Sequence, residues 1–203
     1  YFNPQQSHKL IKEATQLGSL LGTRLNTLRV RGESMKKTLG ELHTIMEKKE
    51  PGIYMFGDVG GGLFFSNNLG GYLGSSRYRA TSETVRIGAA GKNAAGLSWS
   101  VSLDGGHVSS KSRHTVLDAS GKQNIFGLSL SVGKRFEKIS AALNGSVGHS
   151  KGKITSSLPG SMQMDKLKTR VPETLFNVGG DVAYALTDEL SIAASPQLWV
   201  FPK

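Results

Sequence analysis

The spacing of apolar residues changes at Pro51-Gly52. Before that point they recur every three or four positions, which predicts a helix over residues 6–31 and a second helical segment over residues 33–49, with Gly32 weakening the join. The apolar stripe consists of Leu10, Ala14, Leu17, Leu21, Leu25, Leu28, Met35, Leu39, Leu42, Ile45 and Met46. Several of these residues lie seven apart, so a coiled coil is one interpretation. In a coiled coil the other core positions of the heptad would also be apolar, but here they include Arg24, Arg31 and Thr38. The pattern therefore favours an amphipathic helix packed on the rest of the protein.

After Pro51-Gly52, apolar residues alternate with small polar ones, which predicts strands. The clearest case is the run from Leu97 to Gly105, where Trp99 and its apolar neighbours alternate with serines. Seven strand segments are predicted, at residues 54–65, 83–92, 97–105, 125–136, 139–151, 175–186 and 190–201.

The predicted connections alternate in length. Those at residues 66–82, 105–124 and 152–173 are long and polar, whereas those at 136–138 and 187–189 are short. Membrane barrels have short turns at one end and long loops at the other. The polar face of the strands is mostly Ser, Gly, Ala and Asn, which leaves a lumen wide enough for a helix, while the apolar face can meet lipid. The predicted fold class is therefore mainly β: a partial antiparallel transmembrane β-barrel preceded by an amphipathic helix in its lumen.

Composition changes this picture little. The chain has 203 residues, a net charge of +10, 26 glycines and no cysteine, and its mean hydropathy is −0.23. Barrel strands are apolar only at alternate positions, so a modest hydropathy is compatible with a membrane barrel. The basic residues are scattered, without interleaved aromatic residues, and we expect no nucleic-acid partner.

Candidate catalytic chemistry is weak. Ser34-Met35-Lys36-Lys37 matches the S-x-x-K pattern of serine acyl-enzymes, but no K-T-G element follows in a suitable place. The five histidines, His8, His43, His107, His114 and His149, do not have metal-ligand spacing. We therefore expect no enzyme activity, no metal and no cofactor.

Several stretches resemble the translocator domain of classical (type V) autotransporters, in which a linker helix precedes a C-terminal barrel. These stretches are Thr23–Arg29 in the helix, Gly52–Gly57 and Ile87–Lys92 in the first two strands, and Gly179–Asp188 with Pro196–Leu198 near the end. The family's barrel has more strands than the seven found here and ends on an aromatic residue, so we expect this chain to be incomplete at its C-terminus. The place that matches the family's asparagine cleavage pair holds Ser19-Leu20 instead, which argues against self-cleavage.

The resemblance implies a bacterial outer-membrane translocator that exports or displays an N-terminal passenger. Its expected partners are outer-membrane lipid, the barrel-assembly machinery and its own passenger, and its expected division is a linker segment at residues 1–50 and barrel strands at 51–203. The alternative is a soluble or surface-exposed β-rich binding or adhesion module with a helical stalk.

Charged residues on the helix and the strands are candidates for contacts that hold the helix in the lumen. Helix arginines facing carboxylates on the wall would form such contacts, and losing one partner of a half-buried pair costs about 3–5 kcal/mol. The candidates are Arg24, Arg29, Asp58, Arg86 and Asp181.

Overall fold

The structure is a computed structural model and describes residues 4–67, 76–114, 118–157 and 167–203. One long helix, α1 (Pro4–Glu47), precedes a single antiparallel sheet. The strands are β1 (Gly52–Asn67), β2 (Ser76–Lys92), β3 (Leu97–His114), β4 (Asp118–Phe136), β5 (Ile139–Ser157), β6 (Leu167–Ala185), β7 (Ser191–Ala194) and β8 (Gln197–Val200).

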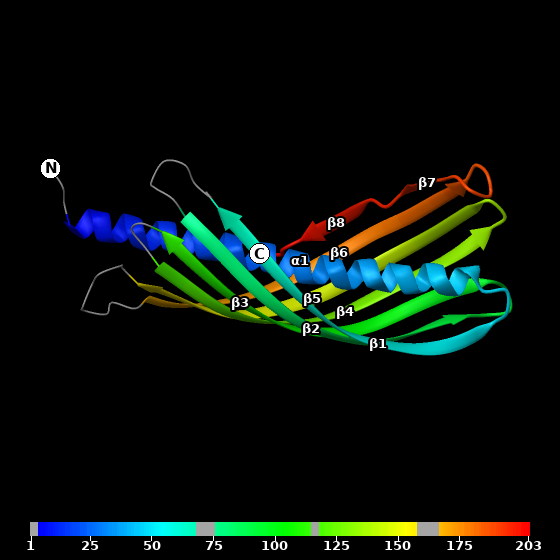
Figure 1. Ribbon diagram of the computed structural model, residues 1–203, viewed down its shortest axis with the longest axis horizontal. Coiled ribbons are helices and arrows are strands. Elements are labelled where there is room, and N and C mark those ends of the chain that lie inside the picture. The colour runs from blue at the N-terminus through cyan, green and yellow to red at the C-terminus, as the bar shows by residue number, and fades with distance from the viewer. Residues whose placement is uncertain (1–3, 68–75, 115–117, 158–166) are drawn as a thin grey trace.

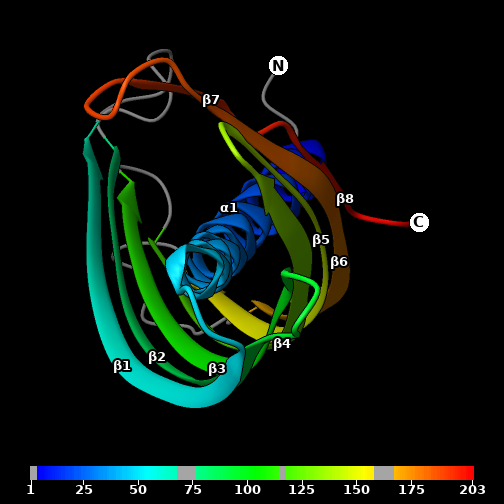
Figure 2. The same ribbon diagram turned by 90° about the vertical axis from the view of Figure 1, so that its right-hand side faces the viewer.

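The sheet curls into a deep trough that holds α1 along its concave side (Figures 1 and 2). Each strand from β1 to β6 pairs with the next in the chain, and both β7 and β8 pair with β6. Among the described residues, no ladder joins β1 to β7 or β8, so the sheet is open. The expected mainly β fold, a partial barrel with a helix inside it, is thus confirmed.

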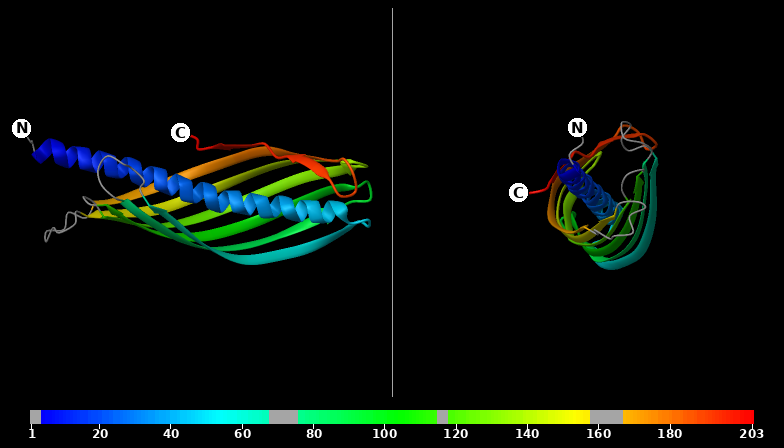
Figure 3. Two further views of the ribbon diagram at one scale, coloured as in Figure 1. Left: turned by 45° about the horizontal axis from the view of Figure 1, so that its top comes forward. Right: turned by 90° about the vertical axis from the view of Figure 1, so that its left-hand side faces the viewer.

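The helix is continuous, so the predicted weakening at Gly32 is wrong. A helical glycine costs only about 1 kcal/mol relative to alanine. Its neighbours Arg31 and Met35 are both fully buried against the wall, which stabilises the turn that contains Gly32. The N-terminal part of α1 extends beyond the strands (Figure 3). No helix in the described parts of the chain is both long and apolar enough to cross a membrane.

Most strands are longer than predicted, at the end where long loops were expected. For example, β3 continues to His114 and β4 begins at Asp118, so the predicted loop at residues 105–124 is mostly strand. The apolar alternation fades there because the outward residues become polar, while inward positions still hold Val108 and Ile125, both buried. The pattern therefore marks where the outer face is apolar, not where the strands end.

The alternation sorts side chains onto the two faces as expected. Ser98, Ser100 and Ser102 of β3 face inward and are fully buried, whereas Leu97 and Leu103 are exposed on the outer face. On the outer face of the other strands, the large exposed apolar side chains include Met55, Val85, Ile87, Phe126, Leu130, Val132, Leu143, Phe176, Val178, Val182, Ile192 and Leu198. We call this surface the outer apolar belt.

The opposite end of the sheet has short connections. The pair Phe136↔Ile139 closes the β4–β5 hairpin over two residues, and Glu137 has a φ of 43° there. The predicted last strand is split into β7 and β8 because Pro196 cannot donate to the ladder. The carbonyl of Pro196 still accepts a hydrogen bond from the Gly180 N–H at 3.1 Å, which keeps this edge attached to β6.

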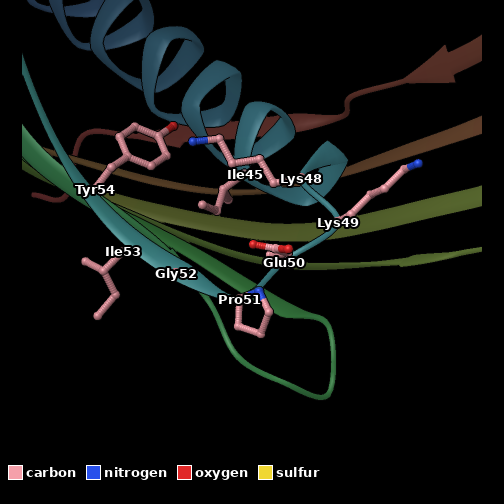
Figure 4. A pocket seen from close by; sticks show the side chains of 8 residues that line it. All are labelled: Ile45, Lys48, Lys49, Glu50, Pro51, Gly52, Ile53 and Tyr54. Carbon is pink, nitrogen blue, oxygen red and sulfur yellow. The ribbon is translucent and has the colours of Figure 1, made fainter.

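The helix ends where a short segment turns into β1 (Figure 4). Lys92 at the end of β2 donates to the carbonyl oxygens of Met46, at 3.2 Å, and Lys48. A cation at a helix C-terminus satisfies carbonyls that have no partner within the helix. The Lys48 ammonium lies 4.5 Å from the centre of the Tyr54 ring, so this end of α1 is held against both β1 and β2.

Candidate functional site: the interface between helix and wall

The lower half of α1, nearest the short connections, is held by apolar packing. Met35, Leu39, Leu42, Ile45 and Met46 are buried, together with Ala90 and Ala142 of the wall, and Tyr54, Phe56 and Trp199 pack against them. We call the five helix residues the lower apolar cluster. These residues continue the apolar stripe predicted from the sequence.

The middle of α1 carries a buried charge. The Arg31 side chain has no exposed surface, and its guanidinium pairs with the Asp104 carboxylate of β3, which is 4% exposed. Arg31 also donates to Ser129 Oγ at 3.0 Å and to the Leu128 carbonyl oxygen at 3.3 Å. Ser34, one turn along the helix, donates to Asp104 Oδ1 at 2.8 Å. Both charges are therefore paired with each other and hydrogen-bonded to neutral groups as well.

Two glycines of the wall make room for this arginine. A Cβ atom added to Gly127 of β4 would overlap the guanidinium, and one added to Gly148 of β5 would overlap the aliphatic stem of Arg31. The sheet is thus recessed where the helix presents its longest inward side chain. We call Arg31, Ser34, Asp104 and Ser129, with these two glycines, the Arg31 site.

Small polar contacts extend the Arg31 site along the helix. Towards the lower apolar cluster, Thr38 Oγ1 lies 2.7 Å from Ser102 Oγ of β3. Towards the N-terminus, Gln123 of β4 donates to Thr27 Oγ1 at 2.6 Å and to the Thr23 carbonyl oxygen at 3.1 Å. Because these helix residues are three or four apart, they lie on one face, and that face meets the serine-rich wall.

Two of the predicted contact residues pair with each other. Arg86 of β2 donates to Asp58 of β1 at 2.6 and 3.1 Å, so the pair joins neighbouring strands. The helix approaches this pair with two side chains. Lys37 Nζ lies 3.5 Å from Asp58 Oδ1, and Glu41 Oε1 lies 3.9 Å from Arg86 Nη2.

The predicted helix arginines lie elsewhere. Arg24 donates to Glu173 of β6 at 3.0 Å and stacks over the Phe201 ring, 5.0 Å from its centre. Arg29 lies over the Phe64 ring at 4.0 Å. Neither contacts Asp58 or Asp181 in the described interactions.

The remaining predicted residue, Asp181 of β6, pairs with His43 of the helix. The histidine is the more exposed partner, at 38% against 10% for the carboxylate side chain. This contact lies beside a cavity of about 410 Å³ that is lined by the helix and by β6, β8 and Trp199.

The S-x-x-K stretch does not form a catalytic pair. The Ser34 hydroxyl is buried and engaged by Asp104, and Lys37 points to Asp58. A nucleophilic serine needs an adjacent base within hydrogen-bond reach and access to substrate. Ser34 has neither a lysine partner nor exposure.

Sequence reasoning missed the most buried pair. Arg31 interrupts the apolar stripe and Asp104 follows three inward serines, so each looked like a polar exception. The available signal was Asp104 as a carboxylate at an inward position of a strand, together with inward glycines on the neighbouring strands. Their mutual approach depends on the register between helix and sheet, which no local pattern encodes.

Comparisons with known proteins bear on the fold. No protein-family model and no curated protein matches the sequence. The translocator domain of the autotransporter NalP from Neisseria meningitidis matches with a TM-score of 0.58 and 16% identity, over 84% of this chain and 56% of that structure. The alcaligin outer-membrane receptor FauA from Bordetella pertussis matches with a TM-score of 0.41 and 12% identity, over 73% of this chain and 26% of that chain. This chain thus spans little more than half the length of the neisserial domain. At that level of identity the likeness concerns architecture, and the chain has the fold of part of an autotransporter translocator barrel.

Proposed function

We propose that this chain is an outer-membrane translocator and anchor that exports or displays an N-terminal passenger. The observation that carries the proposal is the outer apolar belt, which surrounds a wall lined by small polar residues and a helix. A soluble sheet would cover such a surface or replace it with polar residues.

The outer apolar belt runs continuously across neighbouring strands and approaches the height of a bilayer core. On β3 it runs from Leu97 to Leu103, on β4 from Phe126 to Val132 and on β6 from Phe176 to Tyr184. Register joins these runs laterally, since Leu103 faces Leu128 of β4, which in turn faces Val147 of β5. Tilted strands need about 9–11 residues to cross the hydrocarbon. The run of nine residues on β6 reaches that length, and the runs of seven residues on β3 and β4 are about one pair of residues shorter.

The direction of the helix supports a passenger ahead of it. The N-terminal end of α1 leaves the trough at the end where β1, β3 and β5 end and β2, β4 and β6 begin (Figure 1). The two longest separations between paired strands, eight residues from β1 to β2 and nine from β5 to β6, join strand ends on this side. In outer-membrane barrels the longer connections face the outside of the cell. A segment joined to Tyr1 would therefore lie at the cell surface, with α1 as its tether in the lumen.

The function needs no catalytic group. The buried contacts at the Arg31 site and the lower apolar cluster hold a helix, and neither of these two contacts exposes a reactive side chain. The partners we propose are outer-membrane lipid, the machinery that inserts barrels, and the passenger.

The two tryptophans provide a test of membrane insertion. Trp99 lies on the outer face of β3, whereas Trp199 packs against the lower apolar cluster from inside. The Trp199→Phe variant keeps Trp99. In vesicles with brominated acyl chains, the fluorescence of Trp99 in this variant is expected to be strongly quenched by the lipid. The Trp99→Phe variant, which keeps Trp199, is expected to lose little fluorescence. Equal quenching of both, or a protein that stays monomeric in buffer without detergent, would favour the soluble binding module.

Export is tested separately from insertion. An epitope placed ahead of Tyr1, behind a secretion signal, is expected to become accessible to antibody on intact cells. A matched variant with Leu103→Asp and Leu128→Asp on the belt is expected to lose both insertion and display. An epitope that stays hidden although the strands are inserted would overturn the passenger assignment and leave the membrane assignment intact.

A further inference from the structure

The outer face changes character beyond the apolar belt, towards the end with the N-terminal part of α1. There the outward residues of β2 to β6 are mostly polar, and eight exposed ones are basic. We call this surface the basic collar, formed by Arg77, Arg79, Lys111, Arg113, Lys122, Lys151, Lys153 and Arg170.

Register places like charges of the collar directly opposite one another. Lys122 of β4 faces Lys153 of β5, which faces Arg170 of β6. On the other side of the sheet, Arg79 faces Lys111 and Arg77 faces Arg113. Like charges at opposed positions of neighbouring strands destabilise a sheet. This arrangement is therefore costly unless anions lie over it.

The described residues supply few such anions. At these levels of the outer face, Glu83 of β2 is the carboxylate among the side chains described, and the register places Asp118 of β4 opposite Arg113. Within the same residues, no collar side chain forms an ion pair; the pairs that do form lie at the helix and the inner wall. Arg79, Lys111, Lys122, Lys153 and Arg170 have no carboxylate at their paired positions in the described ladders. The counter-charge for these five residues must therefore come from another molecule.

The height of the collar above the belt identifies where that molecule lies. Lys151 is four residues beyond Val147, the last apolar outward residue of β5. At about 3.4 Å per residue and a tilt near 45°, Lys151 lies roughly 10 Å above the apolar edge. Lys151 therefore lies just above the headgroup layer, which is about 5–8 Å thick on each side of the hydrocarbon. The row formed by Lys122, Lys153 and Arg170 is two residues further along the strands and lies roughly 14 Å above the apolar edge.

The other end of the sheet does not share this charge pattern. Near the short connections, Arg135 and Lys138 are interspersed with Glu137, Asp188 and Glu189. A one-sided cationic belt beside the headgroups suits one leaflet that is richer in phosphate than the other. Basic side chains next to an anionic membrane surface each gain favourable interaction energy.

We infer that the basic collar binds the phosphorylated sugar headgroup of an outer-leaflet glycolipid of the lipid A class. The inference rests on the proposed membrane location. Lys122, Lys153 and Arg170 form the central cluster, and their arrangement as an unbroken row across three strands fits a headgroup with more than one phosphate. The guanidinium of Arg170 can hold a phosphate through two hydrogen bonds, whereas the lysines act as point charges.

The test compares two triple variants in nanodiscs of phosphatidylcholine. Lys122→Gln, Lys153→Gln and Arg170→Gln remove three collar charges, and Lys49→Gln, Arg135→Gln and Lys138→Gln remove the same number and kinds at the opposite end. Lipid A is titrated against each protein. The collar variant is expected to bind roughly a hundredfold more weakly than the unmodified protein, at roughly fivefold for each of the three cations. The control variant is expected to bind within about twofold of it.

Three further measurements make the assignment specific. Dephosphorylated lipid A is expected to bind the unmodified protein as weakly as lipid A binds the collar variant. Equal affinity of both triple variants would overturn the inference. So would equally tight, collar-dependent binding of inorganic phosphate or of a short single-stranded DNA, since the site would then take a free anion or a nucleic acid. Quenching of Trp99 by brominated lipid is measured in the same samples. If Trp99 is quenched but lipid A does not bind, the collar inference is wrong; if Trp99 is not quenched, the proposed membrane location is wrong.

Discussion

One helix meets one wall in two different ways. At the Arg31 site a guanidinium enters a recess formed by two glycines and pairs with a buried carboxylate. At the lower apolar cluster, five apolar side chains pack on small wall residues and on three large rings. Charge pairing tolerates little displacement because it depends on a fixed donor geometry, whereas apolar packing is non-directional. We conclude that the Arg31 site sets the position of the helix along the lumen, and that the lower apolar cluster contributes much of the burial.

The largest effect is expected from breaking the buried pair. Arg31→Met leaves Asp104 buried without its partner, which is expected to lower the free energy of unfolding by about 3–5 kcal/mol. Urea unfolding of the protein in lipid vesicles measures this change. Lys36→Met, on an exposed part of the same helix, is the control for loss of one charge and is expected to change stability by less than about 0.5 kcal/mol.

A double variant distinguishes the loss of the ion pair from the cost of leaving one buried charge unpaired. In the Arg31→Met, Asp104→Leu double variant both charges are gone, and most of the lost stability is expected to return because neither buried charge is left unpaired. The helix should, however, lose its fixed position along the lumen. This is detectable as a broader distribution of distances between spin labels on the helix and on β4. A double variant as unstable as Arg31→Met, or one with an unchanged distance distribution, would contradict the role given to the pair.

The next largest effect tests the apolar half of the comparison. Leu42 is completely buried in the lower apolar cluster, and Leu42→Ala is expected to cost about 2–4 kcal/mol through lost burial and the cavity left behind. Leu25 lies on the same helix but is 58% exposed, so Leu25→Ala is expected to cost under about 1 kcal/mol. Spin-label distances should stay narrow in Leu42→Ala, since the Arg31 site remains. Broadening there would mean that apolar packing also fixes the position.

The two halves of this interface also differ in how far the sequence predicts them. The lower apolar cluster follows from helical spacing, because Met35, Leu39 and Leu42 all belong to the predicted stripe. The alternation in β3 likewise predicts which side of each strand is polar. The Arg31–Asp104 pair does not follow, because it joins residues 73 apart in the chain and depends on the tertiary register of helix and sheet.

The same limitation explains the error in strand length and why the sequence did not give the partner of each charged residue. Strand ends were missed where the outer face turns from apolar to polar and basic. Inward apolar residues such as Val108 and Ile125 remain there, but they are too widely spaced among polar residues to form a detectable alternation. Arg86 and Asp58 pair with each other at paired positions of adjacent strands, and the helix meets them through Lys37 and Glu41, which the sequence did not single out as contacts. The sequence identifies charged residues that can form ion pairs, but the pairing of the strands and the position of the helix determine which residues are partners.

A smaller effect is expected from filling the recess. Gly148→Ala places a methyl group against the stem of Arg31, and the resulting overpacking is expected to cost about 1–3 kcal/mol. Gly145 lies on the same strand with its nearest contact at 3.5 Å, an ordinary packing distance. Gly145→Ala is therefore the matched control and should be neutral or slightly stabilising. If both alanine variants unfold at the same urea concentration, the glycine recess is not what admits the arginine.

The smallest effect is expected at the second charged contact of the helix. His43 pairs with Asp181 near the wall's edge, and more than a third of the histidine side chain is exposed. Solvent and salt screen such a pair, so His43→Gln is expected to lower the free energy of unfolding by less than about 1 kcal/mol. Glu33→Gln, at an exposed helix position, controls for the change in helix composition. Because the pair is partly hydrated, any loss should shrink further at high salt. A loss as large as that of Arg31→Met would show that two charged contacts fix the helix. The Arg31 site would then not be the one contact that sets the position of the helix, in contrast to the non-directional packing of the lower apolar cluster.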